Sequence, residues 1–223
     1  MMWSRRTKSR LRAWLDPLSK ARFVIGLAGG ASLLDVGCGN GSPSYFKRLN
    51  ASIRYTGLDI AEHGLSAADH AVADELIFVP SDRFAEGIAS LGTRFDAVVS
   101  AHNLEHVEHP EAVLRGMCSV LRPSGRLYLS FPSRASVDFP SRGGALNFHD
   151  DPTHRWLPDL ALVRSVVERC GCRVVVCCLQ NQPAIGRFLG AIEEPLSRRR
   201  GRVMSFTWHY WGFESVVIAE RKA

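Results

Sequence analysis

The sequence predicts a doubly wound α/β fold, in which helices cover both faces of a sheet. Apolar residues run into an acid and three alternate glycines over residues 33–41. A second strand-like segment, 53–59, ends in another acid, and strand-like and helix-like segments then alternate as far as Pro132. Such alternation is typical of open α/β sheets, which bind ligands where strands end.

Length and composition indicate one globular domain. The chain has 223 residues, of which 46% are hydrophobic and 22% charged. No apolar run approaches the roughly 18 residues of a membrane helix, and no secretory signal is recognisable. The six cysteines lack the paired spacing of a zinc ribbon, so we expect reduced cysteines in a cytoplasmic protein.

Positive charge is concentrated at the N-terminus. Residues 1–22 contain seven basic side chains and one acid, which accounts for the whole net charge of +6. The remainder, 23–223, is formally neutral, which argues against a nucleic-acid-binding face. We expect residues 1–22 to form a basic arm or helix. It either leads into a helix over 18–27, which would end at Gly29-Gly30 and cover the sheet or the active site, or anchors the protein peripherally at an anionic inner membrane surface.

The spacing of the glycine turn excludes two cofactor classes. A P-loop requires Gly-Lys-Ser/Thr, but Gly41 is followed by Ser42 and Pro43. A dinucleotide fingerprint would have its third glycine at position 42, so that motif fails by one residue. What remains is Asp-x-Gly-x-Gly-x-Gly from Asp35 to Gly41, and we expect Ser42 to cap a helix that begins at Pro43.

Three motifs in order carry a family resemblance: this turn, Phe95-Asp96-Ala97-Val98-Val99-Ser100 followed by Leu104-Glu105-His106-Val107, and the turn Leu121-Arg122-Pro123-Ser124-Gly125. Between the last two motifs we expect a helix that begins at Pro110, and after the last one a strand from Leu127. Together they resemble the class I S-adenosylmethionine-dependent methyltransferases, particularly the small-molecule branch (type 11-like). The resemblance covers about residues 23–223 and implies a Rossmann-like sheet of seven mostly parallel strands with a reversed last strand.

The resemblance also implies the cofactor and its contacts. The glycine turn would receive the carboxylate of S-adenosylmethionine, Asp35 would favour its ammonium, and Asp59 would accept hydrogen bonds from the ribose. Asp82, after the third predicted strand, would lie beside the adenine. The predicted cofactor-binding residues are Asp35, Gly37, Cys38, Gly39, Asp59, Ile60, Asp82, Ser100 and Ala101.

Acceptor chemistry is predicted in a long loop, 133–157, that would act as a lid. Two histidines there flank two acids, and we expect His149, Asp151 and His154 to face the acceptor, with His154 or His149 as general base. A purely structural role for these side chains is the alternative. We expect no metal site, because His-Asp-Asp-x-x-His lacks a recognised ligand spacing. The predicted substrate-contacting residues are His102, Asn103 and Trp156.

The C-terminal third is predicted to complete the sheet and to carry an insert, 181–213, before the last strand. An amphipathic helix is expected from Asp159 to Cys170. Its aromatic residues alternate as in a strand and would fill the sheet edge or stack on an acceptor ring. A basic run, Arg198–Arg202, would meet phosphate or a membrane.

The function expected is methyl transfer from S-adenosylmethionine to a small-molecule or glycan acceptor, with oxygen as the preferred acceptor atom. The alternatives are an RNA or protein methyltransferase that uses the basic arm, and a non-catalytic S-adenosylmethionine-binding protein. Nothing in the sequence indicates an oligomeric state.

Overall fold

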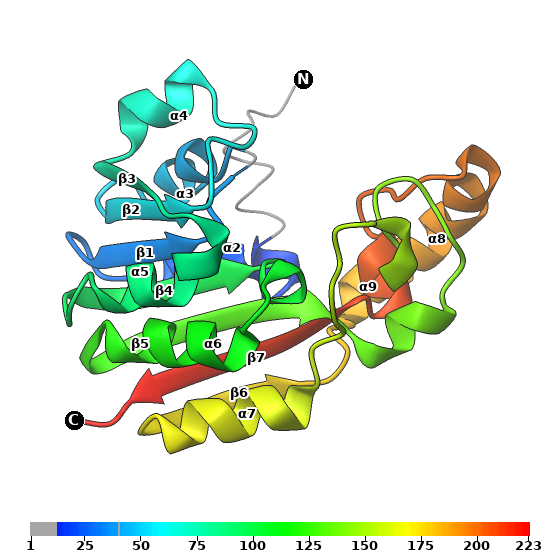
Figure 1. The fold of residues 1–223 in the computed structure, drawn as a ribbon. Helices are drawn as coiled ribbons and strands as arrows, with labels where there is room; N and C mark the ends of the chain where they lie inside the picture. Colours follow the sequence, from blue (N-terminus) through cyan, green and yellow to red (C-terminus); the bar gives the residue numbers. More distant parts are fainter. Residues whose placement is uncertain (1–12, 40) are drawn as a thin grey trace.

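The computed structural model describes residues 13–39 and 41–223. At its centre is a seven-stranded sheet in the order β3-β2-β1-β4-β5-β7-β6 (Figure 1). The first five strands in this order are parallel, and β7 runs antiparallel to both of its neighbours. The predicted doubly wound sheet with a reversed last strand is therefore confirmed. The strands are β1 (Ser32–Val36), β2 (Arg54–Asp59), β3 (Glu75–Phe78), β4 (Phe95–Ala101), β5 (Leu121–Pro132), β6 (Cys172–Cys178) and β7 (Glu214–Arg221).

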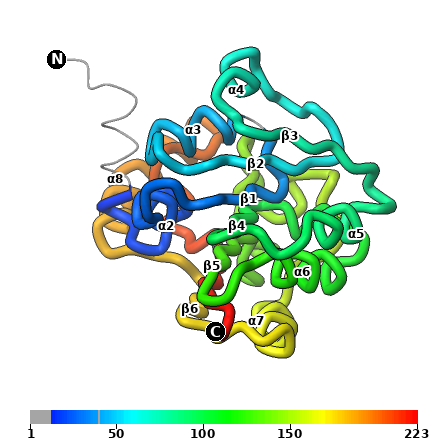
Figure 2. The backbone as a smooth tube through the Cα atoms, turned by 90° about the vertical axis from the view of Figure 1, so that its left-hand side faces the viewer, coloured from blue at the N-terminus to red at the C-terminus, as the bar shows by residue number. Residues whose placement is uncertain are grey.

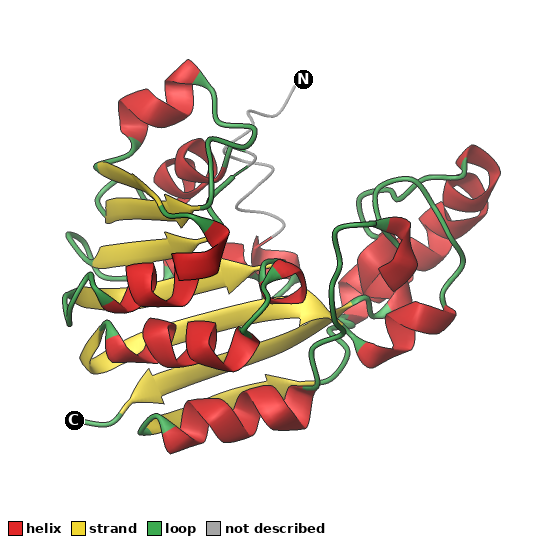
Figure 3. Ribbon diagram, viewed as in Figure 1, coloured by secondary structure: helices red, strands yellow, loops and turns green. Residues whose placement is uncertain are grey.

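Helices cover both faces of the sheet (Figures 2 and 3). One face carries α2 (Lys20–Ile25) and α3 (Ser42–Leu49), and the other carries α5 (Phe84–Ala89), α6 (Pro110–Ser119) and α7 (Leu160–Arg169). The short helix α4 (Ala67–Val72) lies beside α3 at the β3 end of the sheet. Each face has its own apolar core, so the central strand β1 is buried along its whole length.

Helix ends follow capping chemistry that is readable in the sequence. Pro110 occupies the first turn of α6, where its missing N–H is not needed. The side chain of Asp159 accepts a hydrogen bond from the backbone of Leu162 at 2.9 Å and so caps α7. Both helices thereby begin where the sequence places them.

Four local predictions are wrong. Ser42 is not the N-cap of α3: Gly41 holds that position in a left-handed conformation, with φ 76°, and Ser42 is the first helical residue. The helix expected to end at Gly29-Gly30 is α2, which ends at Gly26. The strand expected from Leu127 begins at Leu121. The aromatic segment before β7 is a helix, α9 (Thr207–Trp211), which packs against α8 (Ala184–Arg200) where Gly186 and Gly190 let it approach closely.

A lobe of helices lies beyond the carboxyl ends of the parallel strands (Figure 1). It consists of α8 (Ala184–Arg200) and α9, which connect β6 to β7, together with the loop over 133–157. The loop and the helices are joined by contacts between Arg142 and Glu194 at 2.8 Å and between the Trp208 indole and the carbonyl of Ala145 at 2.9 Å. The lobe therefore faces the edge of the sheet where ligands bind in this architecture.

The predicted arm at 1–22 falls only partly within the described residues, because 1–12 lie outside them. Asp16 is buried and accepts hydrogen bonds from the side chains of Asn181 and His209, at 3.0 and 3.1 Å, which join this segment to the lobe. Among the described residues, none of the helices combines the length and apolar character needed to cross a membrane.

Candidate functional site

The glycine turn lies at the end of β1, between β2 and β4, where the strand order reverses direction. Gly37 has φ 82°, a conformation that glycine adopts without the cost of a Cβ. A Cβ there would lie 2.8 Å from the Asn103 side chain, and one at Gly39 would lie 2.8 Å from the carbonyl of His63. The first two glycines therefore let neighbouring segments approach the turn closely.

Asp35 lies beneath this turn and is 2% exposed. The hydroxyl of Tyr55, on β2, donates a hydrogen bond to Asp35 Oδ2 at 2.6 Å. Burial raises the pKa of Asp35 to about 6, although the Tyr55 hydrogen bond opposes that rise. A buried carboxyl with a raised pKa gains from a cationic ligand, because the cation offsets the cost of the buried negative charge.

Asp59 is the last residue of β2, and its carboxylate lies beside the glycine turn. Its Oδ2 accepts from the backbone N–H of Gly39 at 3.0 Å, and its Oδ1 accepts from the N–H of Ile60 at 2.7 Å. Each carboxylate oxygen has a further lone pair, so the group retains the capacity to accept hydroxyl protons. The role of Asp59 in accepting hydrogen bonds from the ribose stays a prediction, and its place at the end of β2 is compatible with that role.

Asn103 supplies an observation that points to a ligand. Its Nδ2 is buried and has no acceptor within the described part of the chain, although the side chain packs directly on Gly37. An unpaired buried amide is costly, and an acceptor placed at the turn would relieve it. This donor, the carboxylates of Asp35 and Asp59, and the close glycine backbone fit a ligand with a carboxylate, an ammonium and hydroxyl groups.

The remaining cofactor candidates differ in exposure. Cys38 is buried with its sulfur over Gly57, and Ser100 is buried with its hydroxyl donating to the carbonyl of Val36 at 3.1 Å. Those two side chains act in packing at the turn. Ala101 ends β4, whereas Ile60 and Asp82 are exposed beside β2 and β3.

His102 follows β4 with φ 53°, a left-handed conformation that is rare for a side chain of this size. Its Nδ1 contacts Glu105 Oε1 at 3.2 Å and its Nε2 contacts Glu214 Oε1 at 2.7 Å. Burial alone would lower the pKa of His102, but the hydrogen bonds and charges of the two glutamates outweigh it and raise the pKa to about 9. At neutral pH this imidazole is therefore protonated and cannot accept a proton.

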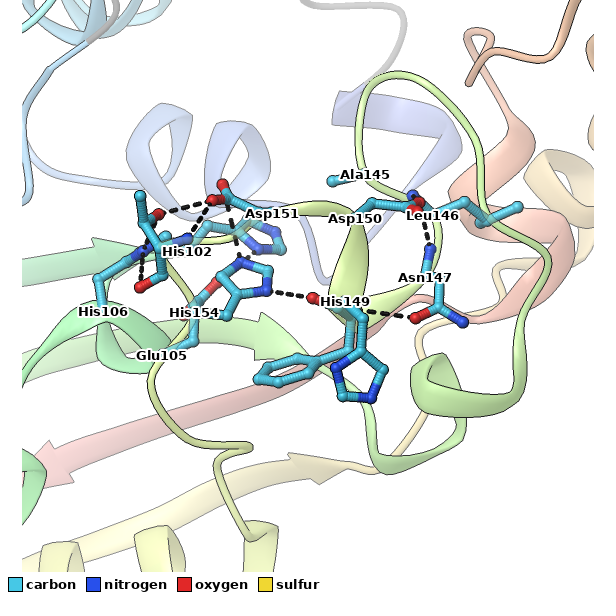
Figure 4. A network of polar contacts seen from close by, with 12 residues as sticks. His102, Glu105, His106, Ala145, Leu146, Asn147, His149, Asp150, Asp151 and His154 are labelled. Carbon is cyan, nitrogen blue, oxygen red and sulfur yellow. Dashed lines mark hydrogen bonds and ion pairs between the residues drawn. The ribbon is translucent and has the colours of Figure 1, made fainter.

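The loop residues predicted to face an acceptor are only partly brought together. His154 lies beside His106, with ring centroids 4.9 Å apart, and its Nε2 is 4.0 Å from Asp151 Oδ2. His149 is exposed, and its imidazole points away from these residues (Figure 4). The loop is fixed against the segment after β4, because the Trp156 indole donates to the carbonyl of Leu104 at 2.6 Å.

The neighbouring acid, Asp150, has a structural role. Its Oδ2 accepts from the backbone N–H groups of Arg142, Leu146 and Asn147 at 3.0, 3.0 and 2.8 Å. Of the two acids that the histidines flank in the sequence, Asp151 alone lies with the histidine cluster.

Two residues of the site escape sequence reasoning. Tyr55 meets Asp35 because β1 and β2 pair in register, with Asp35 opposite Gly57; a tyrosine among apolar strand residues reads as core. Glu214 meets His102 from 112 positions away, and no local pattern signals that contact.

The fold and the turn define a class I S-adenosylmethionine-dependent methyltransferase. The model of a methyltransferase-domain family matches residues 2–176, and the chain belongs to this family. Its cofactor is S-adenosylmethionine, and the residues around the glycine turn fit that molecule.

Curated relatives match about half of the chain. A ubiquinone biosynthesis O-methyltransferase from Xanthomonas oryzae is 36% identical over 119 residues, 49% of this chain and 46% of the relative. A 27-O-demethylrifamycin SV methyltransferase from Amycolatopsis mediterranei is 33% identical over 124 residues, 52% and 45% respectively. The chain thus spans about half the length of the curated relatives it matches.

Solved structures confirm the fold over nearly the whole chain. A methyltransferase from Archaeoglobus fulgidus superposes with a TM-score of 0.55 at 17% identity, covering 97% of this chain and 94% of that one. A putative sarcosine dimethylglycine methyltransferase from Galdieria sulphuraria gives 0.60 at 15% identity, covering 96% and 86%. At such identities the likeness concerns architecture alone.

Proposed function

We propose that the protein transfers the methyl group of S-adenosylmethionine to an oxygen atom of a small-molecule acceptor. When bound, the cofactor supplies an electrophilic methyl group on a sulfonium centre. One structural observation carries the proposal: the segment after β4 connects the two halves of the site. Asn103 packs on the glycine turn, and two residues further on Glu105 and His106 meet His154 of the loop. The names of the O-methyltransferase relatives support oxygen as the acceptor atom.

Hydrogen bonding favours His154 as the group that receives the hydroxyl proton. Its Nδ1 faces the carbonyl of Phe148 at 2.5 Å and therefore carries a hydrogen, which leaves the lone pair on Nε2. His102 has both nitrogens occupied by glutamates. His149 projects to solvent away from the cluster. We therefore retain His154 as general base, with Asp151 beside it, and give His102 the task of shaping the pocket together with Trp208, whose ring lies 5.0 Å away.

A glycan acceptor receives less support than a smaller one. Trp208 stacks on Phe213, with ring centroids 4.7 Å apart, and its indole N–H is bonded to the loop. Trp211 packs against Phe139 at 5.1 Å, and its indole N–H donates to Glu194. Because these rings hold the lobe together, they are less available as stacking platforms for sugars.

The lobe also carries a surface suited to peripheral membrane contact, which we propose in place of a contact made by the N-terminal arm alone. Ile185, Phe188, Ile192 and Leu196 recur along α8 and are 46%, 66%, 63% and 40% exposed. Three arginines, 198–200, occupy its last turn, whereas Glu193 and Glu194 bond inward. An apolar stripe with flanking positive charge suits an anionic lipid surface. The fraction of protein that cosediments with phosphatidylglycerol vesicles should be lower for Phe188→Asp than for the unmodified chain. Equal fractions would refute the proposed membrane contact of α8.

The experiment that tests the proposed function supplies methyl-labelled S-adenosylmethionine together with separated small-molecule, glycan, RNA and protein fractions. Label in small molecules, released by treatments that cleave methyl ethers, is the expected result. Label in RNA or protein would replace the proposal with one of those acceptors. Cofactor binding without transfer to any fraction would indicate a non-catalytic binding protein.

A further inference from the structure

A second cluster of ligand-type side chains lies next to the acceptor side of the site. Glu105, His106 and His154 each offer one atom, a carboxylate oxygen or a ring nitrogen, and these atoms lie within 4.8 Å of one another. Glu105 and His106 belong to the short helix after β4, Leu104–His106, and His154 comes from the loop over 133–157. Figure 4 shows the three side chains together with Asp151.

Glu105 carries the observation that points to a ligand. It is fully buried, and its Oε2 has no hydrogen-bond donor in the described ranges 13–39 and 41–223. A buried carboxylate oxygen without a donor or a cation is strongly destabilising. Its other oxygen, Oε1, is held by His102 Nδ1 at 3.2 Å, which fixes the direction of the unpaired oxygen.

The hydrogen bonds of the two histidines leave a lone pair on each. His154 Nδ1 faces the carbonyl of Phe148, so its hydrogen is there and Nε2 is the acceptor. His106 Nδ1 lies 3.3 Å from the carbonyl oxygen of Thr153 and 2.9 Å from its hydroxyl oxygen. That hydroxyl donates its hydrogen to Asp151 Oδ1 at 2.6 Å, so it accepts from His106. Nδ1 of His106 is then also the donor. Second bonds of this kind fix metal-ligating histidines in their tautomer.

The carboxylate of Glu105 and the unprotonated ring nitrogens of His106 and His154 are thus three acceptors that lie close together without a hydrogen between them. A cation bound among them would interact favourably with all three lone pairs. We infer that Glu105, His106 and His154 bind a divalent cation of the zinc type, with a water molecule in the fourth position. The cation would occupy the Nε2 lone pair of His154, so the general-base role proposed for His154 applies to the metal-free protein. Two imidazoles and a carboxylate suit such a cation. Zinc ligands at bond lengths near 2.1 Å lie about 3.4 Å apart, so side-chain rotations of about an ångström would close the site.

No metal site is expected from the sequence because the spacing of the loop histidines, taken alone, matches no ligand pattern. The structure instead brings His154 together with a glutamate 49 positions earlier and a histidine 48 positions earlier. Backbone geometry fixes this juxtaposition, since the N–H of Arg155 donates to the carbonyl of Glu105 at 2.8 Å. Cation binding would therefore join the loop to the end of β4 and stabilise it there.

The test measures metal binding by the purified full chain without an acceptor, so its outcome does not depend on the proposed function. Chelator-treated protein is titrated with Zn²⁺ by calorimetry, and Co²⁺ is used as a spectroscopic probe. We expect one equivalent to bind, visible absorption bands from Co²⁺ in a four-coordinate site, and a higher melting temperature with Zn²⁺. We expect His154→Ala, His106→Ala and Glu105→Gln each to weaken binding at least tenfold.

His149→Ala is the matched control, because His149 lies in the same loop but points away, and it should bind Zn²⁺ as the unmodified chain does. Because Glu105 is buried, circular dichroism checks the fold of its variant, and the two histidine variants decide the result if it misfolds. The inference would be overturned if the unmodified chain did not bind Zn²⁺ stoichiometrically. It would also be overturned if His106→Ala and His154→Ala bound Zn²⁺ as tightly as the unmodified chain does. A loss caused equally by His149→Ala would overturn it as well, since exposed histidines would then be the ligands.

Discussion

The hydroxyl of Tyr55 donates to Asp35 Oδ2 at 2.6 Å, and this buried contact joins β2 to β1 directly beneath the glycine turn. It leaves Asp35 poised between its neutral and charged forms, since burial raises the pKa to about 6 while the hydrogen bond holds it from rising further. Cofactor affinity should therefore depend on pH through a residue that never reaches solvent.

The first prediction follows from that contact. If Asp35 must be ionised to favour the cofactor ammonium, affinity for S-adenosylmethionine should be constant above about pH 7. It should fall by up to about tenfold per pH unit below 6. Tyr55→Phe removes a hydrogen bond that lowers the pKa, so the fall should begin at a higher pH. Calorimetric titrations with S-adenosylmethionine across pH 5–8 provide the measurement. Identical pH profiles for the unmodified chain and Tyr55→Phe would show that ionisation of Asp35 does not control cofactor affinity.

A second prediction concerns the close approach of Asn103 to the turn. Gly37→Ala adds a Cβ 2.8 Å from Asn103 at a residue with φ 82°, so both strain and a clash result. Gly92→Ala is the matched control, because Gly92 has φ 70° and open space around the added atom. Each should lose about 1 kcal/mol of unfolding free energy from the backbone conformation. Gly37→Ala should lose more unfolding free energy than Gly92→Ala, because of the clash with Asn103, and it alone should abolish cofactor binding. Equal losses of unfolding free energy in denaturant titrations would refute the packing argument.

A third prediction tests Asp59. Asp59→Ala removes two acceptors that hold the backbone of Gly39 and Ile60, as well as the group proposed to receive the ribose. Affinity for S-adenosylmethionine should fall by at least tenfold, because hydrogen bonds to a charged group are worth about 1.5–3 kcal/mol each. Glu86→Ala, on the exposed surface of α5, should bind normally. Unchanged affinity in Asp59→Ala would exclude Asp59 from the site.

The sequence predicts the cofactor half of the site because its signals are local. Gly37, Gly39 and Asp35 lie within five positions of one another, and Asp59 ends the next strand, so spacing and strand order are enough to bring them together. The conformation at Gly41 is the exception. There the glycine takes the cap position itself, and the Ser42 predicted to cap becomes part of the helix.

The acceptor half depends on long-range contacts that no spacing reveals. His102 is held by Glu214 from the far end of the chain, and His154 meets His106 rather than His149. The aromatic segment misleads for a different reason. Phe206, Trp208 and Tyr210 alternate as strand residues do, but packing against α8 selects a helix, and tertiary contacts outweigh that local preference.

A fourth prediction uses the two glutamates around His102. Its pKa is raised to about 9 in the folded protein, above the ordinary value of 6.5. The ion pairs therefore contribute stability that is fully present below about pH 6.5 and is lost as the pH rises through 9. His102→Gln should lower the unfolding free energy on the order of 3 kcal/mol at pH 6. The difference from the unmodified chain should shrink between pH 7 and 10, and a constant difference in urea titrations would argue against a charged His102.

The last prediction separates the two loop histidines proposed from the sequence. His154 has a lone pair on Nε2 beside Asp151 and His106, whereas His149 is exposed and turned away. Once an acceptor is identified, His154→Ala should reduce kcat of the chelator-treated protein about 100-fold or more, as removal of a general base does, while S-adenosylmethionine affinity stays unchanged. His149→Ala should stay within about twofold of the unmodified rate. A rate loss confined to His149→Ala would transfer the role to that residue, and unchanged rates in both variants would mean that neither accepts the proton.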